Sequence, residues 1–170
     1  MKVFLTHSYF YQLDSKQWAN KTPYPPLATI TALAFLEEQG LKTEFYDVAL
    51  DPSPELGKGR ITDSKADVVA IYDDGFNYLT KMCLTNMRHA CFELIHAAKK
   101  TGAKVIVSSS DSTDHPELYL KEGADIVIKG EAEHALLDSI NALKNKQDLN
   151  TVLGIMYLVD SAVVKSPPRP

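Results

Sequence analysis

The sequence predicts a three-layer α/β domain of the flavodoxin-like, Rossmann-like class. We expect a five-stranded parallel sheet of order 2-1-3-4-5, with a hairpin at the C-terminus. Short runs rich in valine and isoleucine alternate with longer stretches whose apolar residues recur at helical spacing. The strand runs are almost continuously apolar, which indicates strands covered on both faces and joined by right-handed crossovers.

The first half of the chain begins this alternation. KVFLT (2–6) is the predicted first strand, and TEFYDV (43–48) is the second. Between them the segment 27–39 has one apolar helical face, opened by two prolines and ended by a glycine. The stretch 51–65, DPSPELGKGRITDSK, is rich in proline and glycine, and we expect a surface loop there.

The second half repeats the pattern. We expect strands at 67–73, 103–108 and 124–129, and helices at 79–102, 115–122 and 131–144. These elements complete a domain over residues 1–150. Residues 151–170 are predicted to form a hairpin and then a proline-rich linker toward a catalytic domain that lies outside this sequence.

The composition excludes several classes of function. A net charge of -4 with scattered Lys and Arg argues against binding to nucleic acid or to an anionic membrane surface. No apolar run is long enough to span a bilayer, and the N-terminus lacks a cleavage site, so we expect a cytoplasmic protein.

The two cysteines predict no metal site. Cys83 and Cys91 lie eight residues apart on an expected helix, which is too far for a disulfide. The chain has no CxxC pair or three-cysteine cluster, so it offers no thiolate site for zinc or an iron-sulfur cluster. We expect both thiols to be buried in the core.

A ligand crevice is expected beyond the carboxyl ends of the strands, where the strand order reverses. The candidate contacts all follow predicted strands. They are His7, Ser8, Tyr9 and Phe10; Tyr72, Asp73, Asp74, Gly75 and Phe76; Ser108, Ser109, Ser110 and Asp111; and Gly130 and Glu131.

Each group has a purely structural alternative. His7 suits metal ligation or proton transfer, but a lone loop histidine more often does neither. The run SSSDST (108–113) suits a polar ligand, or caps a helix through Asp111, Thr113 or Asp114. Asp73 to Gly75 could bind a cation, although a turn is the better interpretation.

Aromatic residues crowd the long connection that follows the first strand. A segment of this length without periodicity is usually functional or disordered, and function is the better interpretation here. The side chains could cover a flat ligand or dock a neighbouring domain. They are Tyr9, Phe10, Tyr11, Trp18 and Tyr24.

Four stretches, taken in order, resemble the N-terminal cobalamin-binding domain of B12-dependent radical SAM enzymes. They are KVFLTHSYF, KTPYPPLATITALAFLEEQGLKTEFYDV, ADVVAIY and GAKVIVSSSDSTDHPELYLKEGADIVIKGEAE. The likeness covers nearly the whole chain, and the final GIMYLV resembles the bridge to the catalytic barrel of that family.

The resemblance implies a cobalamin-binding module that catalyses nothing alone. The iron-sulfur cluster and S-adenosylmethionine would belong to a covalently linked radical SAM domain, and a methyltransferase is one candidate for the parent enzyme. His7 to Phe10 would lie near the corrin. Tyr72 to Phe76 and Ser108 to Asp111 would follow the nucleotide tail, with Gly130 and Glu131 at the edge.

Departures from the family pattern keep alternatives open. The Asp-x-His-x-x-Gly motif of classical cobalamin domains is missing around His7, and Ser108 and Ser109 replace a Gly-Gly pair. Ala28 and Ala132 replace two further glycines. A degenerate domain that serves only for structural docking is therefore one alternative. A receiver-like signalling domain is another, but the first strand ends in Thr6-His7 where a receiver has two acidic residues for Mg²⁺.

Overall fold

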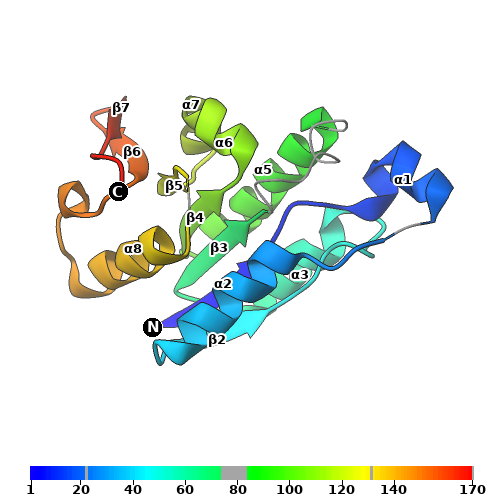
Figure 1. Ribbon diagram of the computed structural model, residues 1–170, viewed down its shortest axis with the longest axis horizontal. Coiled ribbons are helices and arrows are strands. Elements are labelled where there is room, and N and C mark those ends of the chain that lie inside the picture. The colour runs from blue at the N-terminus through cyan, green and yellow to red at the C-terminus, as the bar shows by residue number, and fades with distance from the viewer. Residues whose placement is uncertain (22, 74–83, 131, 170) are drawn as a thin grey trace.

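The computed structural model describes residues 1–21, 23–73, 84–130 and 132–169. Its single sheet has the order β2-β1-β3-β4-β5-β6-β7 (Figure 1). The strands are β1 (Lys2–Thr6), β2 (Lys42–Phe45), β3 (Val68–Tyr72), β4 (Lys104–Ser108), β5 (Ile126–Ile128), β6 (Ile155–Val159) and β7 (Ala162–Lys165). The five parallel strands and their order confirm the predicted fold class.

Helices cover both faces of this sheet (Figure 1). The principal α-helices are α2 (Leu27–Glu38), α3 (Pro54–Ser64), α5 (Leu84–Lys100), α7 (Pro116–Lys121) and α8 (Glu133–Asn145). α2 and α8 pack on one face, and α3, α5 and α7 pack on the other. Shorter helical pieces are η1 (Tyr11–Leu13), α1 (Ser15–Asn20), α6 (Ser110–Asp114) and η2 (Leu149–Thr151).

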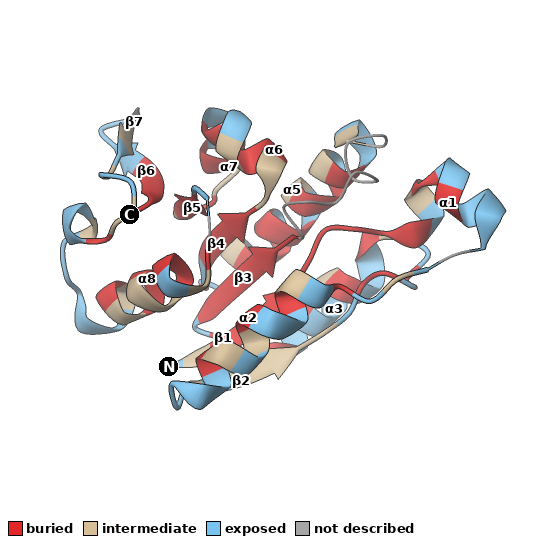
Figure 2. Cartoon of the chain, in the orientation of Figure 1, coloured by how far each residue is buried: buried red, intermediate tan, exposed pale blue. Residues whose placement is uncertain are grey.

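Alternate residues of the buried strands point to opposite faces, as the pleat of a strand requires. On β1, Val3 and Leu5 belong to the core beneath α2 and α8, whereas Phe4 belongs to the core beneath α3 and α5. Every residue of β3 is buried, which explains why the run Val68–Tyr72 carries no alternating polar positions. Figure 2 shows the buried central strands between partly exposed helices.

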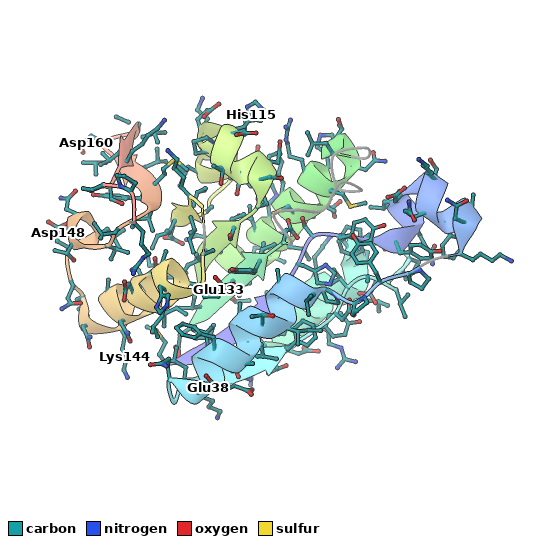
Figure 3. The ribbon with its side chains drawn as sticks, viewed as in Figure 1. Glu38, His115, Glu133, Lys144, Asp148 and Asp160 are labelled. Carbon is teal, nitrogen blue, oxygen red and sulfur yellow. The ribbon has the colours of Figure 1, made fainter. Side chains whose placement is uncertain are left out.

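Charged side chains mark the ends of α8 (Figure 3). Glu133 stands in the first turn and Lys144 in the last, so both complement the helix dipole. α8 begins at Glu133, shortly after β5 ends at Ile128. The predicted turn at Gly130 lies between these two elements. Gly130 has φ +81°, a left-handed conformation that glycine adopts without strain.

One prediction about local structure was wrong, and one helix was not foreseen. The stretch 51–65 is not a loop throughout, because α3 occupies most of it and buries Gly57, Ile61 and Ser64 against the core. The helix expected at 115–122 is confirmed as α7, and a further short helix, α6, precedes it and meets it at His115 (Figure 3). Pro116 explains this break, because a proline disfavours helical backbone in the residue before it.

The C-terminal hairpin is confirmed, and it extends the sheet. β6 pairs antiparallel with β5, and β7 pairs antiparallel with β6. The residues that follow β7 are also held: Ser166 N–H donates to the Ile155 carbonyl (2.9 Å), and Gly154 N–H donates to the Pro167 carbonyl (2.8 Å). Arg169 forms an ion pair with Asp138 of α8.

The burial expected for the two cysteines is confirmed for one of them. Cys91 is buried, as expected, whereas Cys83 lies outside the described residues. Among the described residues, no helix is long and apolar enough to cross a bilayer.

Candidate functional site

Three neighbouring strand ends meet at the carboxyl edge of the sheet. Ser8 follows β1 and binds Asp73, which follows β3: Ser8 N–H donates to Oδ1 (2.6 Å) and Ser8 Oγ–H donates to Oδ2 (2.7 Å). Asp73 N–H in turn donates to the carbonyl of Ser108, the last residue of β4 (2.8 Å). These three predicted site residues are therefore brought together by direct hydrogen bonds.

Asp73 is a buried carboxyl group in this edge, with 7% of its surface exposed. Burial raises the pKa of Asp73, while the two hydrogen bonds from Ser8 act in the opposite direction. Burial also raises the pKa of the nearby Cys91 thiol, and the charge of Asp73 adds to that effect. Cys91 is thus an inert core thiol in this environment.

A pocket opens beside these strand ends, with about 300 Å³ of empty space that is continuous with solvent. Its wall combines polar residues from the strand ends with residues of three helices. The lining residues are Ser8, Asp73, Leu84, Met87, Arg88, Ser109, Ser110, Asp111 and Tyr119. Five of these nine residues were predicted as site residues from the sequence.

Asp111 links the helices around the pocket. Arg88 of α5 donates to it through two nitrogens, Nε to Oδ2 and Nη2 to Oδ1, both at 2.7 Å. Tyr119 of α7 donates its hydroxyl to Oδ2 (2.6 Å). Burial acts to raise the pKa of Asp111, but the bonds from Arg88 and Tyr119 outweigh it and hold that pKa below its usual value. Asp111 is therefore an ionised, fully paired carboxylate.

The serine run after β4 forms a helix cap. Ser109 Oγ accepts from Ser112 N–H (2.9 Å), and Ser109 N–H donates to Ser112 Oγ (3.0 Å), which completes a capping box at the start of α6. The expected capping role is confirmed for this run, but the cap is Ser109 rather than Asp111, Thr113 or Asp114. Ser110 follows it and faces the pocket.

His7 is held by both ring nitrogens. Tyr9 N–H donates to Nδ1 (3.2 Å), so Nε2 carries the proton and donates to Asp47 Oδ1 (2.9 Å). Burial acts to raise the pKa of Asp47, but the bond from His7 and a bond from Ala49 N–H lower it on balance. His7 is 2% exposed, so it offers no free nitrogen to a metal in this arrangement.

The remaining predicted contacts are mostly buried. The ring of Tyr9 packs against that of Tyr24 with the centroids 5.0 Å apart and the planes tilted by 36°, and Phe10 lies in the core with no exposed surface. Tyr72 belongs to the core beneath α2 and α8, and its carbonyl accepts from Thr29 Oγ1 (2.6 Å). The first aromatics of the connection, Tyr9 to Tyr11, are thus packed in the protein, whereas Trp18 keeps half of its surface exposed. Asp74, Gly75, Phe76 and Glu131 lie outside the described residues.

The pocket residues on α5 and α7 were not predicted from the sequence. Leu84, Met87 and Arg88 come from α5, and Tyr119 comes from α7. These four residues do not follow strands, and they belong to no motif. One signal was available: Arg88 is the only Lys or Arg between Leu84 and Phe92, and it flanks the apolar face of the helix.

No protein-family model matches the sequence, and no curated protein matches it. Solved structures do. TsrM from Kitasatospora setae, a radical S-adenosylmethionine methyltransferase solved with cobalamin and a 4Fe-4S cluster, matches 99% of this chain at 17% identity with a TM-score of 0.78. OxsB, a cobalamin-dependent S-adenosylmethionine radical enzyme solved with aqua-cobalamin and S-adenosylmethionine, matches 99% at 22% identity with a TM-score of 0.73.

The chain has the fold of one part of these two enzymes. It spans 29% of TsrM and 22% of OxsB, so most of either enzyme lies outside the matched region. The resemblance expected from the sequence is confirmed at the level of the fold.

The pocket is too small to enclose a corrin macrocycle, so its residues could contact only a polar part of a cobalamin. Its lining offers hydroxyl, carboxyl and guanidinium groups beside Leu84 and Met87. None of the pocket-lining residues has a buried polar side-chain atom that lacks a hydrogen-bond partner. Hydrogen bonds within the protein therefore satisfy the buried polar side-chain atoms of the lining.

Proposed function

We propose that this chain is the cobalamin-binding module of a larger radical SAM enzyme. The nucleotide arm of the cofactor would enter the pocket beside the ends of β1, β3 and β4, and the corrin would cover the carboxyl edge of the sheet. A covalently linked catalytic domain would supply the cluster chemistry. A methyltransferase reaction is one candidate for the whole enzyme.

The observation that carries this proposal is the match of 99% of the chain to two radical SAM enzymes solved with cobalamin. The pocket adds independent support, because it lies at the edge where open α/β sheets bind ligands. Its lining unites Ser8, Asp73 and Ser109 to Asp111, which the sequence predicted as cofactor contacts. His7 would be a neighbour of the corrin rather than an axial ligand, since both ring nitrogens are engaged.

A second candidate is a structural docking module that has kept the fold and lost the cofactor. The observation that favours it is the closed polar network of the pocket, in which Arg88, Asp111 and Tyr119 satisfy one another. The side chains of Ser108 and Ser109 also occupy positions that are glycines in the resembled family. Such side chains would oppose a close approach of a ligand to the backbone.

A titration with hydroxocobalamin, followed by visible absorbance and calorimetry, tests the two candidates. The variant S108G/S109G is measured in parallel. Saturable one-to-one binding by the wild type, with a shifted corrin spectrum, is the expected result. Binding only by the glycine variant would favour the docking module, and binding by neither protein would refute the cofactor proposal.

A further inference from the structure

We propose that Arg88 is the residue of this pocket that binds the phosphodiester of the cobalamin nucleotide arm. This inference rests on the proposed function. Arg88 is the only Lys or Arg among the described residues that line the pocket. Its side chain keeps 22% of its surface exposed, so an entering group can reach it.

Arg88 has hydrogen-bond donors left to offer. A guanidinium carries five N–H groups, and the two bonds to Asp111 use one on Nε and one on Nη2. No hydrogen bond from Nη1 to a described residue is present, although the Tyr119 side chain also interacts with the guanidinium. A planar fork of this kind suits a phosphate, and a hydrogen bond between charged groups is about twice as strong as one between neutral groups.

Asp111 fixes the direction of these donors. Its carboxylate is 7% exposed and takes bonds from both Arg88 and Tyr119. Moving Arg88 away would leave a buried charge without its partner, which is strongly unfavourable. Arg88 is therefore held in place within the pocket lining, so little conformational freedom is lost when an anion binds.

The opposite wall adds neutral groups. Ser110 lines the pocket as a half-buried residue beside the capping Ser109. Asp111 is compensated by Arg88, which leaves Asp73 as the other carboxyl group in the lining. Asp73 is already bound to Ser8 through both of its oxygens. Arg88 and Ser110 thus remain as the polar groups of the lining that can contact an inserted phosphodiester.

The test compares two corrinoids, cobalamin and cobinamide, because cobinamide lacks the nucleotide arm and its phosphodiester. The variant R88Q/D111N replaces the ion pair by two amides of similar size, so no unpaired charge is buried. K99Q is the matched control: Lys99 lies on the same helix and pairs with Asp125 (2.8 Å), away from the pocket lining. Circular dichroism establishes that each variant is folded.

We expect R88Q/D111N to weaken cobalamin binding about tenfold or more, with cobinamide binding unchanged within about twofold. K99Q should change neither affinity. An equal loss for both corrinoids, or no loss for cobalamin, would overturn the assignment of Arg88 while leaving the proposed function intact. Failure of the wild type to bind either corrinoid would refute the proposed function, and the role of Arg88 with it.

Discussion

Ser8 at the end of β1 donates two hydrogen bonds to the carboxyl group of Asp73 at the end of β3, one from its backbone and one from its hydroxyl. This contact joins residues 65 positions apart and forms one wall of the pocket. The other wall depends on Arg88 and Asp111. The two carboxyl groups are in opposite electrostatic states, because burial raises the pKa of Asp73 whereas its partners lower that of Asp111.

The substitution D73N should change how stability depends on pH. Because the pKa of Asp73 is raised in the folded state, this carboxyl group ionises at a lower pH in the unfolded chain than in the folded protein. The free energy of unfolding therefore falls as pH rises from the usual aspartate pKa of about 4 through the folded-state pKa. Asn can keep both contacts with Ser8 without a buried charge. Urea unfolding at acidic and at neutral pH should show that the free energy of unfolding of D73N rises relative to that of the wild type as pH rises. An equal loss of stability at both pH values would contradict this.

The substitution D111N should have the opposite pH dependence. Because the pKa of Asp111 is lowered on balance, its stabilising contribution is present above the usual aspartate pKa and is lost as pH falls through the folded-state pKa. At neutral pH we expect a cost of about 3 kcal/mol, since the Arg88 charge loses its partner. R88Q/D111N should recover part of this cost. A neutral-pH loss that persists undiminished in strong acid would be inconsistent with the ion pair as its cause.

Two glycines of α3 should respond differently to alanine. A Cβ at Gly57 would stand 3.0 Å from a Val48 methyl and 3.2 Å from a Leu94 methyl, whereas a Cβ at Gly59 would meet nothing within 4 Å. G59A should stabilise the protein by about 0.5–1 kcal/mol, because alanine favours a helix more than glycine does. G57A should not stabilise the protein, because steric repulsion between the new Cβ and the Val48 and Leu94 methyl groups offsets the helix propensity of alanine. Thermal unfolding compares the two variants, and an equal rise in melting temperature for both would contradict the close packing of α3 on α5.

The Ser109 cap should contribute to stability independently of any ligand. S109A removes the capping box and should cost about 1 kcal/mol, whereas S109G should cost only a few tenths. S110A is the control, because no hydrogen bond of the Ser110 side chain to a described residue is present. Chemical unfolding of the three variants gives the comparison. A cost for S110A equal to that for S109A would argue against the cap.

The sheet could be predicted from sequence because its strands are buried runs that helices separate. β3 and β4 are almost uniformly apolar and were placed to within a residue or two. α3 was missed because its buried positions include Gly57 and Ser64, which carry little hydrophobic signal. Ser53 followed by Pro54 and Glu55 was a usable sign of a helix start.

The pocket could be predicted only in part, because strand ends converge by topology whereas helix positions depend on packing. Ser8, Asp73 and Asp111 follow strands that the parallel order places side by side. Arg88 and Tyr119 reach the same pocket from helices, and nothing in their sequence spacing predicts that they share Asp111. Packing also divides the aromatic connection after β1, since Tyr9, Phe10 and Tyr11 are buried whereas Trp18 is half exposed.

Hydrogen exchange with and without a saturating excess of cobalamin tests the central claim most directly, because it reports both binding and its location. We predict slower exchange in peptides that cover Ser8, the first turns of α5 and the β4–α6 turn, with β6 and β7 unchanged as an internal control. Protection confined to other segments, or no change anywhere, would contradict a cobalamin site at the ends of β1, β3 and β4.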